Sequence, residues 1–286
     1  MWGVTIIAAG LLVGGMPLIA GHRGTGTSDH GNPYPENSIE SIAQAFAEGA
    51  DLVEVDVQLD ADGVAILWHD KRVSVQAGGR YHVRDVARDE LAPLVGSHGD
   101  STTVPTFADA LDLTLSLASC RLAMDVELKV YCECDRAALV RAVADLLLER
   151  DATARVIVTS SDFDALRLIE SILPCIETGW IAPVPALQWP EFRNRLSQRF
   201  PIEWFIARRP WVASAAVARH FARQAHSRGI RLGIWTVDEP QDIAVFAEAG
   251  YDLIITNEPD VARDVFERRI PSPAPPSPAP SSPSAP

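Results

Sequence analysis

The sequence is poor in cysteine, and its four cysteines form neither a Cys-x-x-Cys pair nor a zinc-finger spacing. Their spacing therefore gives no indication of a structural zinc site. Cys132-x-Cys134 lies just beyond Lys129. We expect free thiols here and at Cys120 and Cys175, with a regulatory disulfide or contact with a soft metal as the alternative.

Positive charge is also scarce. The chain has 25 lysine and arginine residues against 38 aspartate and glutamate residues, and its formal net charge is -13. Such a field repels nucleic acids and anionic membrane surfaces, so neither is expected as a partner. Any anionic ligand would need a site that is locally positive.

The first 21 residues lack charged side chains altogether. A secretory signal normally begins with a positively charged region, which is missing here. Glycine and proline residues interrupt the apolar run, residues 16–21 are needed for a first strand, and the remainder is too short to span a bilayer. We predict that residues 1–15 form an apolar extension of a cytoplasmic protein. A degenerate signal sequence, which would make the protein secreted or membrane-associated, is the alternative.

The last segment, residues 271–286, contains only proline, serine and alanine. Because this composition cannot bury apolar surface, we predict a disordered tail. Residues 16–270 remain for a folded domain, and their number is close to the roughly 250 residues of a typical (β/α)8 barrel.

Short apolar segments alternate with helical patterns along this domain. The alternation is typical of βα units in a parallel sheet, and eight such units indicate closure into a (β/α)8 TIM barrel. The predicted strands cover residues 18–21, 52–57, 122–128, 156–160, 176–181, 204–207, 232–237 and 253–256.

The helical patterns have recognisable ends. In the first, Asn37 is followed three residues later by Glu40, which is typical of an N-cap, and Gly49 marks the end. Further helices are predicted over residues 136–150, 215–228 and 240–249.

One segment breaks the alternation. After a turn at residues 60–63 and a short strand at 64–68, about 35 residues precede the next helix near Phe107. Loops of this length usually hold function. We therefore expect residues 71–104 to form a small insertion near the mouth of the barrel.

Acidic residues occupy the inward faces of two predicted strands. Alternate side chains of a strand share a face, so Glu54 and Asp56 project together, as do Glu127 and Lys129. Buried carboxylates need compensation, which one divalent cation supplies, and oxygen ligands favour Mg2+ or Ca2+. A salt-bridge network of the three carboxylates with Arg23 and Lys129 is the alternative.

Two histidines each close an apolar strand. His22 and His69 lie where a barrel places its active site, at the carboxyl ends of the strands. Histidine titrates near neutrality and both takes and gives protons, so we predict that this pair performs acid and base catalysis. The sequence leaves the two roles unassigned.

The motifs His22-Arg23-Gly24, Pro35-Glu36-Asn37, Glu54-x-Asp56, His69-Asp70 and Glu127-x-Lys129 follow one another in a distinctive order, and two late segments, at residues 234–237 and 254–259, complete it. The series resembles the glycerophosphodiester phosphodiesterase family. The resemblance implies a (β/α)8 barrel, a divalent metal, and hydrolysis of small-molecule glycerophosphodiesters to glycerol 3-phosphate and an alcohol, a reaction of lipid and glycerol metabolism.

Further site residues follow from this resemblance. Arg23 and Lys129 are expected to hold the phosphate, Arg23 by bidentate contact and Lys129 as a point charge. The family pattern also places Glu36 and Asn37 at the site, although a helix cap is enough to explain Asn37. Trp235 is either core packing or a wall for the glycerol moiety.

Two other residues are expected to have structural roles. We expect Asp70 to orient a nearby loop and Asn257 to form a turn at the end of a strand.

Three other functions remain open. A lysophospholipase D on the same scaffold would have a hydrophobic rim, and a non-catalytic barrel would bind phosphodiesters without turnover. A metal-independent sugar-binding barrel is the third. The sequence leaves open the leaving alcohol, the oligomeric state, and whether water or the adjacent glycerol hydroxyl attacks phosphorus.

Overall fold

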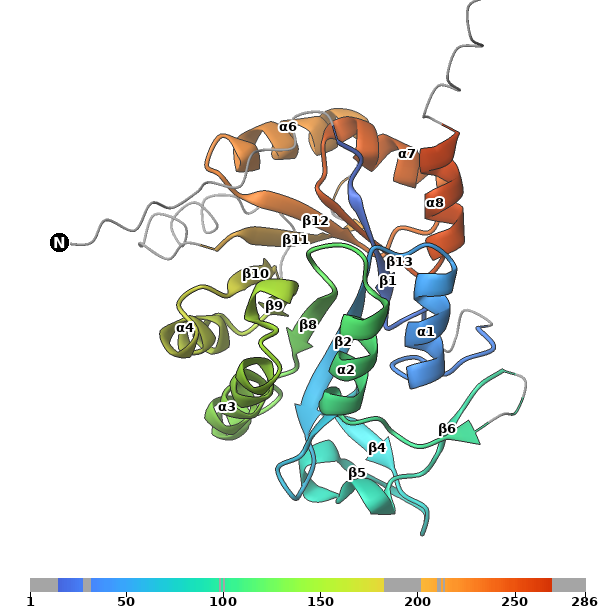
Figure 1. Ribbon diagram of the computed structural model, residues 1–286, viewed down its shortest axis with the longest axis vertical. Helices are drawn as coiled ribbons and strands as arrows, with labels where there is room; N and C mark the ends of the chain where they lie inside the picture. The colour runs from blue at the N-terminus through green and yellow to red at the C-terminus, as the bar shows by residue number, and fades with distance from the viewer. Residues whose placement is uncertain are drawn as a thin grey trace, which may run out of the picture.

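The computed structural model is a closed barrel of eight parallel strands surrounded by helices (Figure 1). The barrel closes because β1 pairs with both β13 and β2. The predicted (β/α)8 TIM barrel is confirmed. Its strands are β1 (Leu18–His22), β2 (Leu52–Leu59), β8 (Met124–Leu128), β9 (Val156–Ser160), β10 (Glu177–Ile181), β11 (Trp204–Arg208), β12 (Arg231–Trp235) and β13 (Leu253–Thr256).

The structure describes residues 15–27, 32–97, 99, 101–182, 202–209, 212 and 214–268. The predictions for the N-terminal extension and for the tail at 271–286 therefore lie outside the described residues, apart from residue 15. Within these ranges, no helix has the length and apolar character that crossing a bilayer would require.

The described chain has seven α-helices, of which six lie between strands and the last follows β13. They are α1 (Ile39–Ala47), α2 (Phe107–Leu117), α3 (Glu133–Glu149), α4 (Phe163–Ile172), α6 (Ala215–His226), α7 (Pro240–Ala249) and α8 (Pro259–Glu267). Helix α7 has the predicted bounds, whereas α3 begins three residues earlier than predicted, with Cys132 as its N-cap.

The cap of α1 differs from the prediction. Ser38, rather than Asn37, is the N-cap, and its side chain accepts a hydrogen bond from the backbone N–H of Ser41. Asn37 has a φ of 60°, outside the helical range, and its side chain points elsewhere. The cap interpretation of Asn37 is therefore wrong.

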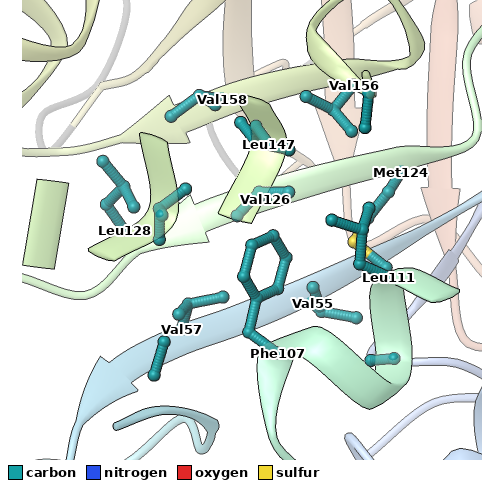
Figure 2. Packing of buried hydrophobic residues seen from close by; sticks show 14 of the residues in the cluster. Val55, Val57, Phe107, Leu111, Met124, Val126, Leu128, Leu147, Val156 and Val158 are labelled. Carbon is teal, nitrogen blue, oxygen red and sulfur yellow. The ribbon is translucent and has the colours of Figure 1, made fainter. Parts of the chain in front are cut away.

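Successive side chains of a barrel strand point alternately outward, toward the helices, and inward, toward the barrel interior. Val55 and Val57 of β2 pack outward with Phe107 of α2 and the apolar residues of β8 and α3 (Figure 2). The residues between them, Glu54 and Asp56, consequently face inward. Below these charges, the interior is filled by an apolar cluster of Ala20, Leu52, Leu122, Ile157, Trp204, Ile206, Leu253 and Ile255.

The segment after β2 forms its own small layer beside the barrel (Figure 1). It comprises β3 (Ala65–Leu67), which pairs antiparallel with β2, and two small antiparallel ladders. These are β4 (Arg72–Ser74) with β5 (Arg80–His82), and β6 (Leu94–Val95) with β7 (Ser101–Thr102). A separate apolar cluster, which includes Val73, Val83 and Leu91, holds the layer together.

Candidate active site

Four of the candidate residues lie on three adjacent strands at one end of the barrel. His22 is the last residue of β1 and is in register with Glu54 of β2, while Asp56 is in register with Glu127 of β8. The carboxyl ends of these strands therefore bring one histidine and three carboxylates to the same mouth.

The three carboxylates form a tight cluster. Glu54, Asp56 and Glu127 each offer an oxygen within 4.8 Å of the others. Burial, followed by the charges of Asp56 and Glu127, raises the pKa of Glu54 well above its usual range. Burial alone would also raise the pKa of Asp56, but Lys129 and then Arg23 outweigh it and hold that pKa well below its usual range.

The two predicted phosphate-binding cations contact these carboxylates. Lys129 Nζ lies 2.7 Å from Glu127 Oε1 and 3.0 Å from Asp56 Oδ1. Arg23 Nε lies 3.1 Å from Asp56 Oδ2, and its Nη1 lies 2.8 Å from Glu36 Oε1. Part of the predicted alternative, a network of salt bridges between the carboxylates and the two cations, is therefore present.

The charges of the site do not balance. Two cations face five carboxylates, which belong to Glu36, Glu54, Asp56, Asp125 and Glu127. Asp56 Oδ1 is also buried, with the Lys129 ammonium 3.0 Å away but no well-formed hydrogen bond among the described residues. Excess negative charge and oxygen donors from two strands suit a hard divalent cation, so Glu54, Asp56 and Glu127 fit the predicted ligand set.

His22 is buried and tied to Asn257. Its Nδ1 lies 2.8 Å from Asn257 Oδ1, and its Nε2 lies 4.0 Å from Glu54 Oε2. Burial and then the charge of Arg23 lower the pKa of His22 to about 4. The imidazole is therefore neutral at physiological pH.

His69 lies in the loop after β3 and is more exposed than His22, with 31% of its side chain accessible. Its Nδ1 lies 3.0 Å from Asp70 Oδ1, and its carbonyl accepts a hydrogen bond from the Tyr131 hydroxyl. The backbone N–H of Trp68, the residue before His69, donates to the Asp56 carbonyl at 3.0 Å, which places His69 and Asp56 at one mouth. Asp70 thus contacts the histidine directly, beyond the loop-orienting role expected of it.

Asn37 links the loop after β1 to the carboxylate cluster. Its Nδ2 donates to Asp56 Oδ2 at 2.9 Å, and its Oδ1 accepts from the Asp56 backbone N–H at 3.1 Å. Glu36, the residue before it, binds Arg23. Both residues therefore contact members of the site.

Trp235, at the end of β12, lies beside His22 with ring centroids 6.4 Å apart. It also packs against the interior apolar cluster, so it is partly core. Its Nε1 is buried and has no hydrogen-bond partner in the described part of the chain. The guanidinium of Arg208, at the end of β11, lies 5.6 Å from the ring centroid.

Sequence reasoning missed three polar residues at the site. Asp125 lies two residues before Glu127 on the same inward face, and burial raises its pKa to about 7 while Thr159 Oγ1 donates to it at 2.6 Å. The strand alternation already contained this signal. Asn257 lies in the late motif at residues 254–259, but its contact with His22 joins segments far apart in the chain, and Asp238 lies outside both late motifs.

The cysteine prediction is wrong for one pair. Cys132 and Cys134 form a disulfide where β8 leads into α3, because their Cα atoms lie only 5.2 Å apart. Cys120 and Cys175 are free, as expected.

The fold and the site define a (β/α)8 barrel whose mouth combines a carboxylate cluster suited to a divalent cation with a neutral imidazole. The model of the glycerophosphoryl diester phosphodiesterase family matches residues 22–261. The chain belongs to this family.

Known proteins with similar sequences and folds agree. A glycerophosphodiester phosphodiesterase of Caldanaerobacter subterraneus is 25% identical over 256 residues, covering 85% of this chain and 95% of the relative. A glycerophosphodiester phosphodiesterase from Parabacteroides distasonis has a TM-score of 0.68 at 22% identity, covering 88% and 98%. An Oleispira antarctica phosphodiesterase, solved with the product sn-glycerol-3-phosphate, has a TM-score of 0.71 at 18% identity, covering 88% and 97%. At these identities the solved structures show the fold alone.

Proposed function

We propose that the protein hydrolyses glycerophosphodiesters to sn-glycerol 3-phosphate and an alcohol, with one divalent cation, Mg2+ or Ca2+. The observation that carries the proposal is the cluster of Glu54, Asp56 and Glu127 within 4.8 Å, next to the neutral imidazole of His22. Family membership and the Oleispira antarctica complex support the same substrate class.

Glu54, Asp56 and Glu127 would hold the cation. When bound, it neutralises phosphodiester oxygens and polarises phosphorus for attack. Arg23 and Lys129 add positive charge at a mouth that would otherwise repel the anionic substrate. Their ion pairs with Asp56 also fix its carboxylate in place.

The surroundings of the two histidines favour different roles. His22 is neutral and buried, so its Nε2 accepts the proton of the attacking oxygen. His69 is more exposed and its Nδ1 is held by the Asp70 carboxylate at 3.0 Å, which leaves Nε2 to donate a proton to the leaving alkoxide. The attacking oxygen belongs to water or to the glycerol hydroxyl next to the phosphate, and both routes use the same two histidines.

A cavity with both charged and apolar walls lies beside the site. This cavity of about 340 Å³ lies between the insertion and the β8–α3 connection, and Lys129 and Tyr131 line it. Its other polar lining residues include Lys71, Arg84 and Asp135. Leu59, Val83 and Leu139 also line the cavity, so both a polar alcohol and the acyl chain of a lysophospholipase D substrate would find partners there.

Hydrolysis of glycerophosphocholine, followed by phosphorus NMR, tests the proposal. We expect sn-glycerol 3-phosphate to appear with Mg2+ or Ca2+ and its release to stop with EDTA. Lysophosphatidylcholine, assayed in parallel, tests the lysophospholipase D alternative. Absence of turnover with every glycerophosphodiester and either cation would refute the proposed function.

A further inference from the structure

The amide of Asn257, one residue beyond β13, has a fixed orientation. Its Nδ2 donates to Asp238 Oδ2 at 2.9 Å, and its backbone N–H donates to Asp238 Oδ1 at 2.8 Å. An ionised carboxylate only accepts hydrogen bonds, so the amide nitrogen must face Asp238. The amide oxygen is therefore directed away from Asp238.

That oxygen meets His22. Asn257 Oδ1 accepts a hydrogen bond from the Thr27 backbone N–H at 3.2 Å and lies 2.8 Å from His22 Nδ1. An amide oxygen cannot donate, so a ring proton must lie on Nδ1 whether or not the other ring nitrogen also carries one. Nε2, which faces Glu54 Oε2 at 4.0 Å, is therefore the nitrogen that can carry the lone pair.

We propose that Asp238 and Asn257 are positioning residues that hold His22 in the Nδ1–H tautomer, leaving Nε2 free to accept a proton. Asp238 acts on the imidazole only through the Asn257 amide. The use of Nε2 in turnover rests on the proposed function, whereas the tautomer itself does not. The competing interpretation is that Asp238 serves only the backbone, because it also accepts from Thr256 Oγ1 and joins the end of β13 to the β12–α7 connection.

Asp238→Asn separates the two interpretations, because it keeps the shape of the side chain. In this variant the Asn257 amide is no longer held by a carboxylate and can rotate, presenting Nδ2 to His22 and moving the ring proton to Nε2. With glycerophosphocholine and Mg2+, we expect kcat to fall about 10- to 100-fold, a cost typical of lost outer-shell partners, with KM little changed.

Nitrogen NMR of histidine-labelled protein reports the tautomer directly. The His22 signals, assigned by comparison with His22→Gln, should show a protonated Nδ1 in the wild type and a mixture of tautomers in Asp238→Asn. The double variant Asp238→Asn/Asn257→Asp restores one donor and one acceptor between the two positions. It should recover the Nδ1–H signal and most of kcat, whereas Asn257→Asp alone sets two carboxylates against each other and should not.

Asp252→Asn is the matched control. Asp252 Oδ2 lies 2.8 Å from His226 Nε2 just before β13 begins, at the opposite end of the barrel from the mouth. We expect it to leave kcat and the His22 spectrum unchanged. The positioning role is overturned if Asp238→Asn keeps wild-type kcat, or loses kcat while His22 remains Nδ1–H. A wild-type protein without turnover would refute the proposed function, while the His22 spectra would still decide the tautomer.

Discussion

Asn37 binds Asp56 through both ends of its amide, donating to the carboxylate at 2.9 Å and accepting from the backbone N–H at 3.1 Å. The contact joins the loop after β1 to the middle of the carboxylate cluster. It explains why Asn37 has a φ of 60° and leaves the capping of α1 to Ser38. The geometry of Asp56 therefore depends on a residue outside its own strand.

Loss of this amide should impair turnover more than stability. Glycine accepts a positive φ, so Asn37→Gly removes the side chain without adding backbone strain. We expect kcat on glycerophosphocholine to fall about 10- to 100-fold. Ser38→Ala is the control, since it removes the cap at a cost of about 1 kcal/mol and should leave kcat unchanged. If Asn37→Gly keeps the same kcat as Ser38→Ala and the wild type, the site role of Asn37 is contradicted.

The two histidines should respond differently to the leaving group. Removal of an acid or base group typically costs about 100- to 10,000-fold in rate, and we expect this loss for both His22→Ala and His69→Ala with glycerophosphocholine. A nitrophenyl ester of glycerol phosphate has a leaving group that needs no proton. Steady-state kinetics with this ester should show activity restored in His69→Ala and still lost in His22→Ala. The reverse pattern would exchange the two roles.

Glu170 should make stability depend on pH. Burial raises the pKa of this carboxyl to about 7, against the hydrogen bond that Thr178 Oγ1 donates at 2.6 Å. The unfolded carboxyl ionises near pH 4.5 and the folded one near 7, so stability falls as the pH rises through this window. Glu170→Gln removes the effect, and its Tm should exceed that of the wild type at about pH 8 but match it at about pH 5.

The control for this experiment is Glu149→Gln, because the Glu149 side chain is 66% exposed. It should shift Tm equally at both pH values. A Glu170→Gln variant that behaves in the same way would show that Glu170 ionises normally.

The disulfide predicts a thiol count. With Cys132 and Cys134 bonded and Cys120 and Cys175 free, the denatured protein should react as two thiols before reduction and four afterwards. The double variant Cys132→Ser/Cys134→Ser should give two thiols under both conditions. Four thiols in unreduced protein, purified without reductant, would show that the pair is not bonded.

Much of the fold was predictable because strand alternation is a local signal. All eight barrel strands lie where the apolar segments place them, and the inward direction of Glu54 and Asp56 follows from a period of two. The same period contained Asp125. Local patterns could not choose between Asn37 and Ser38 as the cap, because the choice depends on the contact with Asp56 on another strand.

Contacts between distant segments were beyond the sequence. His22 and Asn257 are 235 positions apart and meet only because the barrel closes β1 against β13. Asp238 enters the site through Asn257, so it could not have been found without that closure. Asparagine and aspartate are both common in turns, and a turn is the role that the sequence predicts for Asn257.

Cation binding measured by titration calorimetry tests the central claim most directly. We predict that each chain binds one Mg2+ or Ca2+ ion, and that Asp56→Asn weakens binding by at least the ~10-fold that loss of an outer-shell partner costs. Asp135→Asn, a change in the other group of possible ligands beside the disulfide, should leave this binding unchanged. Binding that survives Asp56→Asn but is lost in Asp135→Asn, or a protein that binds neither cation and turns over in EDTA, would contradict the account.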